Sequence, residues 1–487
     1  MNSVHQSVRP VFPKGIILGS AISACNMVGL STLNALLVLY ATHQLHISVK
    51  QAYVIYAAFG ALYYCTALLG GYLGDRYDYK LAIFLGGILT SIGGFLLIVP
   101  SIAYLLAGLA FFIMGCSLIV PNLYCLLGKL YAKDDQNRES GFTIVYALTN
   151  LGGAVAAFAV GFIAEKYSFA TAFFATACVL IIAFLLFALG HHRFDFYSDA
   201  KTPVYKSQIN LHNILYTAGS IALAVPLLVL LLHYAKISNI LMLILGAVTF
   251  IALIILSSKE KKQIRIKFLL FLTFLVIGIA FWSLYMLAPS ALVIFIQHNV
   301  NRQIGSVTIP TGSMYGLNPL FVLIFGPIVS FCLVWLTKRH IKISLPAKFS
   351  IGIVSMGIGY LLLAFGILSA NSLGYTLIWW VVLSYFFQSS GELFIAPTSY
   401  AMVGTLCPAH LEGLMMGVFR LSIGVSGAFS GFLAAATIPK TQNITSPLAS
   451  NHVFLHAFML YGGITLGIGI AVLLFAPWFK KMGQSAK

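Results

Sequence analysis

The amino-acid sequence predicts an all-α membrane protein of fourteen spanning helices, arranged as two six-helix bundles with an inserted two-helix hairpin. Two observations carry this prediction. The 487 residues are 60% hydrophobic and only 8% charged, which is too apolar for a chain whose surface faces water. Apolar windows of about 20 residues, the length that crosses roughly 30 Å of hydrocarbon, also recur along the chain between short polar breaks.

The order of the predicted spans divides the chain into three parts. The first bundle, residues 1–190, holds the spans 14–42, 50–74, 80–100, 102–131, 139–164 and 168–190. A linker at 191–262 carries the hairpin, with apolar segments at 211–234 and 238–257. The second bundle, residues 263–487, holds the spans 266–298, 312–337, 346–369, 374–406, 410–437 and 452–479. Two such bundles are typical of transporters that rock around a site near the membrane midplane.

The net charge of the chain is strongly positive because acidic residues are scarce. Lys and Arg number 28 and Asp and Glu number 11, which gives a formal charge of +17. We therefore predict the lipid bilayer, and no nucleic acid, as the partner of this charge. Bases gather in loops on one side, as in the run from Lys259 to Lys267. This bias predicts a multi-pass protein of a bacterial inner membrane with both termini in the cytoplasm.

The sequence gives no sign of a catalytic centre, a cofactor or a metal site. Its seven cysteines show no Cys-x-x-Cys or Cys/His metal spacing. No His-Glu-x-x-His motif, pair of intramembrane aspartates or Ser/His arrangement stands out. We therefore predict that the protein is not an enzyme.

One loop and several longer segments resemble a known family. The loop Gly71-Tyr72-Leu73-Gly74-Asp75-Arg76 is similar to the cytoplasmic signature of the major facilitator superfamily, with Gly71, Asp75 and Arg76 at its signature positions. Further matching segments are 35–40, 56–62, 141–146, 150–152, 317–321, 391–397 and 413–417. Together they resemble the proton-dependent oligopeptide transporter family over nearly the whole chain. The resemblance implies a major facilitator fold and proton-coupled symport of di- or tripeptides, or of peptide-like, amine-bearing solutes.

The first span departs from this family. The family motif Glu-x-x-Glu-Arg-Phe-x-Tyr-Tyr, which the resemblance links to proton coupling, has no side chain in common with this sequence. The matching positions hold Ser23, Asn26, Met27, Val28, Leu30 and Ser31. A seventh-span glutamate of the family is Met286, and a later aspartate is Gln297. Uniport, or transport of a non-peptide solute, is therefore an alternative to proton-coupled symport.

The residues that match the family's binding site are unevenly preserved. Asn150, Asn318 and Glu392 match the end that receives a peptide's amino terminus. Two family bases that hold the peptide's carboxylate are replaced by Asn34 and Val120. The predicted substrate-binding residues are Asn34, Tyr64, Asn150, Trp282, Asn318 and Glu392. This pattern favours an amine-bearing or modified solute, unless Arg420 or tyrosines such as Tyr63, Tyr64 and Tyr285 receive the carboxylate.

One acid and one base fall inside the predicted spans of the second bundle. Glu392 is the single carboxylate expected near mid-bilayer, where a charge requires a partner or water. On antiparallel helices that rise 1.5 Å per residue, the depth of Arg420 differs from that of Glu392 by only about 6 Å. We predict an ion pair that ligand or proton breaks during transport. A static pair that locks two helices together is the alternative.

Two broader alternatives concern the class of the protein and its assembly. A sensor that keeps the fold and the binding end without transporting is the second class, although the sequence holds no large soluble signalling domain. We predict a monomer, with a small peptide or peptide-like solute and protons as its small-molecule partners.

Overall fold

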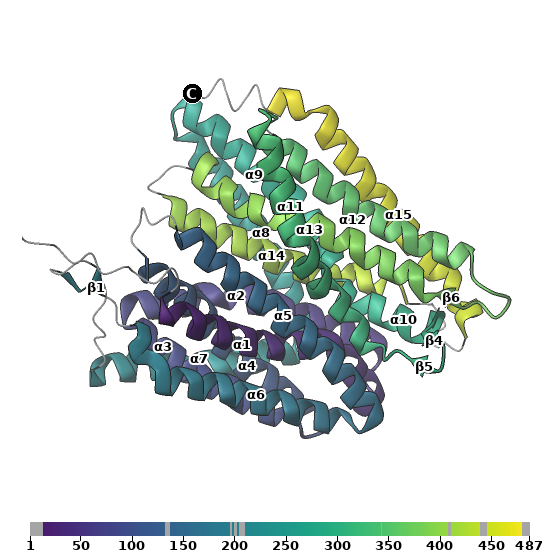
Figure 1. Ribbon diagram of the computed structural model, residues 1–487, viewed down its shortest axis with the longest axis horizontal. Helices are drawn as coiled ribbons and strands as arrows, with labels where there is room; N and C mark the ends of the chain where they lie inside the picture. Colours follow the sequence, from purple (N-terminus) through teal and green to yellow (C-terminus); the bar gives the residue numbers. More distant parts are fainter. Residues whose placement is uncertain are drawn as a thin grey trace, which may run out of the picture.

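The computed structural model describes residues 13–131, 137–194, 197–198, 202–203, 210–341, 343–407, 411–438 and 446–479. The outer ends of the two predicted bundles, residues 1–12 and 480–487, and residues 204–209 of the predicted linker therefore lie outside the described residues. The described chain is mainly helical, and its strands are two residues long each (Figure 1).

Six long helices occupy the region predicted as the first bundle. They are α1 (Lys14–Leu39), α2 (Val49–Arg76), α3 (Tyr79–Leu96), α4 (Ile102–Lys129), α5 (Asn137–Lys166) and α6 (Phe169–Gly190), with a π-helical segment η1 (Tyr40–Gln44) extending α1. Ser48, Asp78 and Ser168 cap α2, α3 and α6 by accepting a bond from a backbone N–H of the first turn. These helices thus begin at short polar breaks in the sequence.

The inserted segment forms a helical hairpin. It consists of η2 (His191–Phe194), β1 (Tyr197–Ser198), β2 (Thr202–Pro203), α7 (Leu211–His233) and α8 (Ala235–Ser258). Helix α7 packs against α4 and α2, whereas α8 packs against α2 and α14, so the hairpin lies across a seam between the two bundles. Asn213 donates a bond of 3.1 Å to the carbonyl of Tyr77, the C-cap of α2. Asn239 donates a bond of 3.1 Å to the carbonyl of Val54 in α2.

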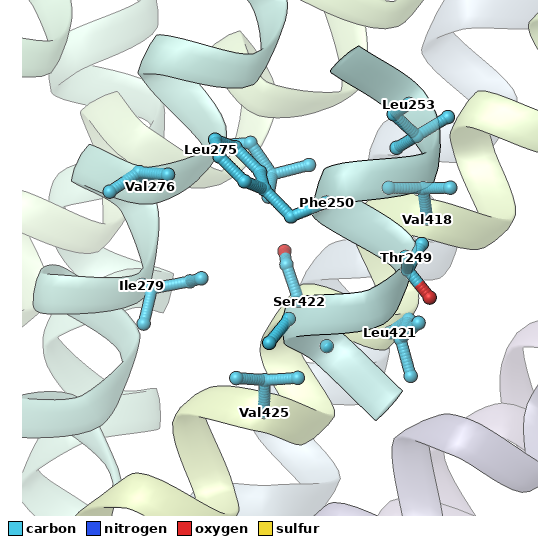
Figure 2. A pocket seen from close by; sticks show the side chains of 12 residues that line it. Thr249, Phe250, Leu253, Leu275, Val276, Ile279, Val418, Leu421, Ser422 and Val425 are labelled. Carbon is cyan, nitrogen blue, oxygen red and sulfur yellow. The ribbon is translucent and has the colours of Figure 1, made fainter. Parts of the chain in front are cut away.

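The hairpin meets the second bundle through an apolar surface. A pocket of about 210 Å³ lies between α8, α9 and α14, and Figure 2 shows Phe250, Leu275, Leu421 and Val425 around it. The hairpin's side-chain hydrogen bonds therefore join it to the first bundle, while its contacts around this pocket are almost wholly apolar.

The second bundle follows the hairpin. Its helices are α9 (Lys262–Tyr285), α10 (Val293–Asn299), α11 (Leu317–Lys338), α12 (Leu345–Leu368), α13 (Ile378–Leu406), α14 (Glu412–Ala435) and α15 (Pro447–Leu474). Short segments between them are η4 (Ala288–Leu292), η5 (Gly312–Gly316), β3 (Val300–Asn301), β4 (Gln303–Ile304), β5 (Val307–Thr308) and β6 (Thr376–Leu377). The span predicted at 266–298 is interrupted between α9 and α10, in a segment that contains Pro289, which has no backbone N–H to donate.

Thirteen of the described helical segments are long and apolar enough to cross a membrane. They correspond to thirteen of the fourteen predicted spans. The fourteenth, α13, does not meet the same measure of hydropathy although it is 29 residues long. It carries Gln388, Ser389 and Glu392 in its middle, so the polar residues of the candidate site lower its hydropathy.

The two bundles lie side by side with their helices running between two ends of the molecule (Figure 1). We name the end where α1 begins and α15 ends the terminal end, and the end with η1 and β3 to β6 the far end. The bundles meet where α2 packs on α14 and where α5 packs on α11 and η5. Gly427 and Gly431 allow α14 to approach α2 closely. A Cβ at Gly427 would lie 3.0 Å from the backbone nitrogen of Ala61, and a Cβ at Gly431 would lie 2.6 Å from the Cβ of Ala57.

Candidate functional site

Asn318 of α11 and Glu392 of α13 lie together in the second bundle. The Asn318 Nδ2 donates to the Glu392 Oε2 at 3.2 Å and to the Ser389 Oγ at 3.0 Å. The Asn318 Oδ1 accepts a bond of 3.1 Å from the hydroxyl of Tyr285 on α9. A carboxylate inside a membrane protein requires such donors, because an unbonded charge in a medium of low polarity is costly. Two of the predicted binding residues are thus brought together.

Asn150 lines a cavity of about 830 Å³ between α5, α11 and α13. Its Nδ2 donates to the carbonyl of Tyr146, one turn earlier, at 3.0 Å. Leu393, the neighbour of Glu392, lines the same cavity, as does Tyr146. The cavity occupies the terminal half of the interface, because its other lining residues fall late in α11 and α13 and early in α5.

Asn34 bridges the two bundles at the position where the family resemblance implies a base. Its Oδ1 accepts a bond of 3.0 Å from Tyr56 on α2, and its Nδ2 donates to the hydroxyl of Tyr315 on η5 at 2.9 Å. The side chain is buried. Both ends of this amide are occupied by protein, so in this conformation Asn34 joins α1, α2 and η5.

Tyr64 and Trp282 occupy different surroundings. Tyr64 lines a cavity of about 80 Å³ at the bundle interface, together with Asn34, Tyr285 and Tyr315. Trp282 is buried and packs edge-on against Tyr285, with ring centroids 5.3 Å apart. Its Nε1 has no hydrogen-bond partner in the described part of the chain. Trp282 therefore supports Tyr285, which in turn donates to Asn318.

Four positions of the missing first-span motif, Ser23, Asn26, Met27 and Leu30, line a small cavity of about 90 Å³. Ser23 shares a hydrogen bond of 2.8 Å with Thr149, and Asn26 donates to the carbonyl of Ile22 at 2.9 Å. Val120 and Tyr124 complete part of the wall. The residues that line this cavity carry no ionised carboxylate or base, so the place where the resemblance implies a charged cluster holds neutral side chains.

The predicted ion pair between Glu392 and Arg420 is not formed in this structure. The guanidinium of Arg420 lies over the ring of Tyr400 at 5.6 Å, whereas the Glu392 carboxylate accepts its bond from Asn318. Arg420 belongs to α14, which packs mainly on α2, and Glu392 faces α9 and α11. The helical rise correctly relates depths along two helices, but it does not fix the direction in which each side chain points.

The loop signature lies at the terminal end of α2. Asp75 accepts a hydrogen bond from the hydroxyl of Tyr79, and both Asp75 and Arg76 are exposed. Gly71 lies beside Pro121 of α4. Asp78, the N-cap of α3, and Lys80, in its first turn, are buried; neither burial was predicted from the sequence.

Several polar contacts close the interface at the far end. Arg302 forms an ion pair of 3.0 Å with Glu165 of α5, and the same carboxylate accepts a bond from the backbone N–H of Thr311 at 3.3 Å. Ser313 of η5 donates to the carbonyl of Phe158 on α5 at 2.9 Å. These residues were not predicted from the sequence, because they fall at span ends and in loops, where polar side chains are common. The far end is therefore shut while a large cavity lies in the terminal half.

Comparison with known proteins identifies the family of this chain. The model of the POT family matches residues 80–481. The dipeptide and tripeptide permease B of Shigella dysenteriae serotype 1 is 29% identical over 453 residues, which cover 92% of this chain and 91% of the relative. The dipeptide and tripeptide permease A of Chromobacterium violaceum is 28% identical over 485 residues, covering 98% of this chain and 95% of the relative.

Solved structures share the fold. A peptide transporter POT in complex with sulfate superposes with a TM-score of 0.83 at 24% identity, over 96% of both chains. A POT family transporter in complex with 5-aminolevulinic acid gives a TM-score of 0.81 at 23% identity, over 96% of this chain and 97% of that one. The resemblance seen in the sequence is thereby confirmed, as is the prediction of a transporter rather than an enzyme. The chain is a multi-pass membrane protein that belongs to the POT family.

Proposed function

We propose that this chain carries di- and tripeptides, or peptide-like amine-bearing solutes, across the membrane as a proton-coupled secondary transporter. The observation that carries this proposal is the carboxylate of Glu392, held by Asn318 near a cavity between the bundles. A carboxylate in such a setting attracts an ammonium group. The chain's relatives are named dipeptide and tripeptide permeases, and a peptide's amino terminus is such an ammonium group.

The proposed transport cycle is a rocking of residues 1–190 against residues 263–487. Closed contacts at the far end and a cavity of about 830 Å³ in the terminal half support it, since they describe one of the two states that such a cycle requires. In the opposite state the far end opens and α5, α11 and α13 close together. A single chain supplies both bundles and the whole site, so the proposed working unit is a monomer.

Protons enter the proposed cycle at Glu392. In the described part of the chain, the acidic residues other than Glu392 lie in loops or near helix ends. A charge at membrane depth is costly unless it is neutralised or paired, so we expect the bundles to reorient only when the Glu392 carboxylate has taken up a proton. The protonated carboxyl still accepts a hydrogen bond from the substrate's ammonium group through its carbonyl oxygen. Proton and substrate then move in the same direction, without the first-span acids that the family resemblance implies.

The proposed location is a bacterial inner membrane with both termini in the cytoplasm, so that the far end faces outward. The bias of Lys and Arg toward the terminal end supports this. In a background without the seven native cysteines, a membrane-impermeant maleimide should label Ser306→Cys in intact cells. Lys261→Cys should be labelled only after permeabilisation. The reverse pattern would contradict the proposed orientation.

Uptake into proteoliposomes tests the proposed function. We expect labelled dipeptides to enter faster under an inward proton gradient than without one, and protein-free liposomes to give the background. Dipeptide uptake that does not depend on the gradient would indicate uniport instead of symport. Uptake of simple amines but not of dipeptides would overturn the proposed substrate class. Dipeptide binding without uptake would favour a sensor.

A further inference from the structure

Arg420 is a cation inside a helix bundle, and no anion of the described residues lies beside it. In the described part of the chain it forms no hydrogen bond or ion pair, and its one ring contact is with Tyr400, at 5.6 Å. A guanidinium carries five N–H donors in a planar fork. A charged side chain at membrane depth is costly unless it is paired or hydrated, and it marks a functional position by default.

Arg420 lies on the seam between the two bundles. One turn before it, a Cβ at Gly417 would lie 2.9 Å from Leu68 of α2, and one turn after it, a Cβ at Gly424 would lie 2.9 Å from the carbonyl of Ala61. Arg420 therefore falls at the level of Tyr64 on α2. A different face of α14, with Val418, Leu421, Ser422 and Val425, meets the hairpin pocket (Figure 2).

Tyrosines of both bundles lie near this guanidinium. The ring of Tyr400 on α13 lies 5.6 Å from it, and Tyr64 of α2 lies at its level on the seam. Phenol hydroxyls can donate to an anion that the guanidinium attracts. Helices of both bundles contribute, so an anion held here would contact both moving parts of the transporter.

Tyr64 connects this group to the Glu392 cluster. It lies at the level of Arg420 on the seam and lines the cavity of about 80 Å³ together with Tyr285, which donates to Asn318, the partner of Glu392. Tyr64 thus lies along the path between a cation and an anion that do not pair with each other. The ends of an extended peptide of two or three residues are separated by roughly 7 to 10 Å. A zwitterion of this size carries a carboxylate that suits the Arg420 guanidinium and an ammonium group that suits the Glu392 carboxyl.

The family's own carboxylate-binding positions do not supply a base here. Asn34 is held between Tyr56 and Tyr315, and Val120 lines a cavity with neutral walls. Lys348 is the one base that lines the 830 Å³ cavity of the terminal half. Arg420 is a base on the seam between the bundles, at the level of Tyr64.

We propose that Arg420 binds the carboxylate of the substrate, so that a zwitterionic peptide is held between Arg420 and Glu392 with Tyr64 between them. This inference rests on the proposed function and names its substrate class, because an amine without a carboxylate would use only half of the site. The planar guanidinium suits a carboxylate, since it can donate two parallel bonds to it.

Affinities for a dipeptide and its carboxyl-terminal amide test the inference. The wild-type protein should bind the free dipeptide at least tenfold more tightly than the amide. Arg420→Gln should weaken binding of the free dipeptide by about tenfold to a hundredfold, as expected when a hydrogen-bonded charge is removed. The same substitution should leave the affinity for the amide unchanged, which also shows that the variant is folded. Arg420→Lys should restore part of the preference.

Lys348→Gln is the matched control, because it removes a different base that faces the cavity. It should keep the wild-type preference for the free dipeptide. A preference that survives Arg420→Gln, or one that disappears in Lys348→Gln, would overturn the assignment to Arg420. Equal affinity of the wild-type protein for both compounds would also overturn it, while leaving peptide transport intact. Failure of the wild-type protein to bind either compound would instead count against the proposed function.

Discussion

Glu392→Gln should make dipeptide uptake independent of the proton gradient. The ratio of uptake measured with the gradient to uptake measured without it should fall to about one. Glu392 is the single acidic residue in the interior of a described helix, and the first-span positions that the family uses for coupling hold neutral side chains. An amide keeps an oxygen that can accept a bond from Asn318, but it cannot take up or release a proton. The ratio isolates coupling, because a loss of substrate affinity lowers uptake in both conditions.

The measurement is uptake of a labelled dipeptide at several concentrations into proteoliposomes, with and without an inward proton gradient. Glu260→Gln is the control, since Glu260 lies in the loop between α8 and α9 and its variant should keep the wild-type ratio. Gradient stimulation that persists in Glu392→Gln would show that another group carries the proton.

Gly161→Val should abolish closure of the far end and lower uptake by more than tenfold. A Cβ at Gly161 of α5 would lie 2.2 Å from the Oγ of Ser313 and 2.5 Å from its backbone nitrogen. Contacts this short require η5 to move away from α5, because a backbone atom cannot be displaced by a change of rotamer. The ion pair between Glu165 and Arg302 and the bridge from Asn34 to Tyr315 lie along the same interface and would be strained.

Labelling of Met314→Cys checks this result. Met314 of η5 is buried while the far end is closed, so an impermeant maleimide should label it faster when Gly161→Val is also present. Gly463→Val is the matched control, since a Cβ at Gly463 of α15 has no atom within 4 Å. Normal uptake with unchanged labelling in Gly161→Val would mean that this contact does not limit closure.

The sequence by itself determined the spans and the chemical character of the site. Hydropathy and short polar breaks located the helices, because lipid requires long apolar segments whose backbone bonds are satisfied within the helix. Asn318 and Glu392 were predicted to act together, and they share a hydrogen bond. Glu392, with Gln388 and Ser389, explains why α13 falls outside the thirteen helices that hydropathy identifies.

Only the tertiary structure decided which charged and polar groups meet. Helical rise placed Glu392 and Arg420 at similar depths, but the Arg420 guanidinium lies over Tyr400, about two turns beyond Glu392 on α13, while Glu392 accepts its bond from Asn318. Asn34 was predicted to bind substrate, yet its amide joins Tyr56 to Tyr315. The closure around Glu165 and Arg302 also depends on loops brought together from distant parts of the chain. Hydropathy locates a span and the helical rise gives the depth of a residue along it. The direction of a side chain and its partners follow from how the helices pack.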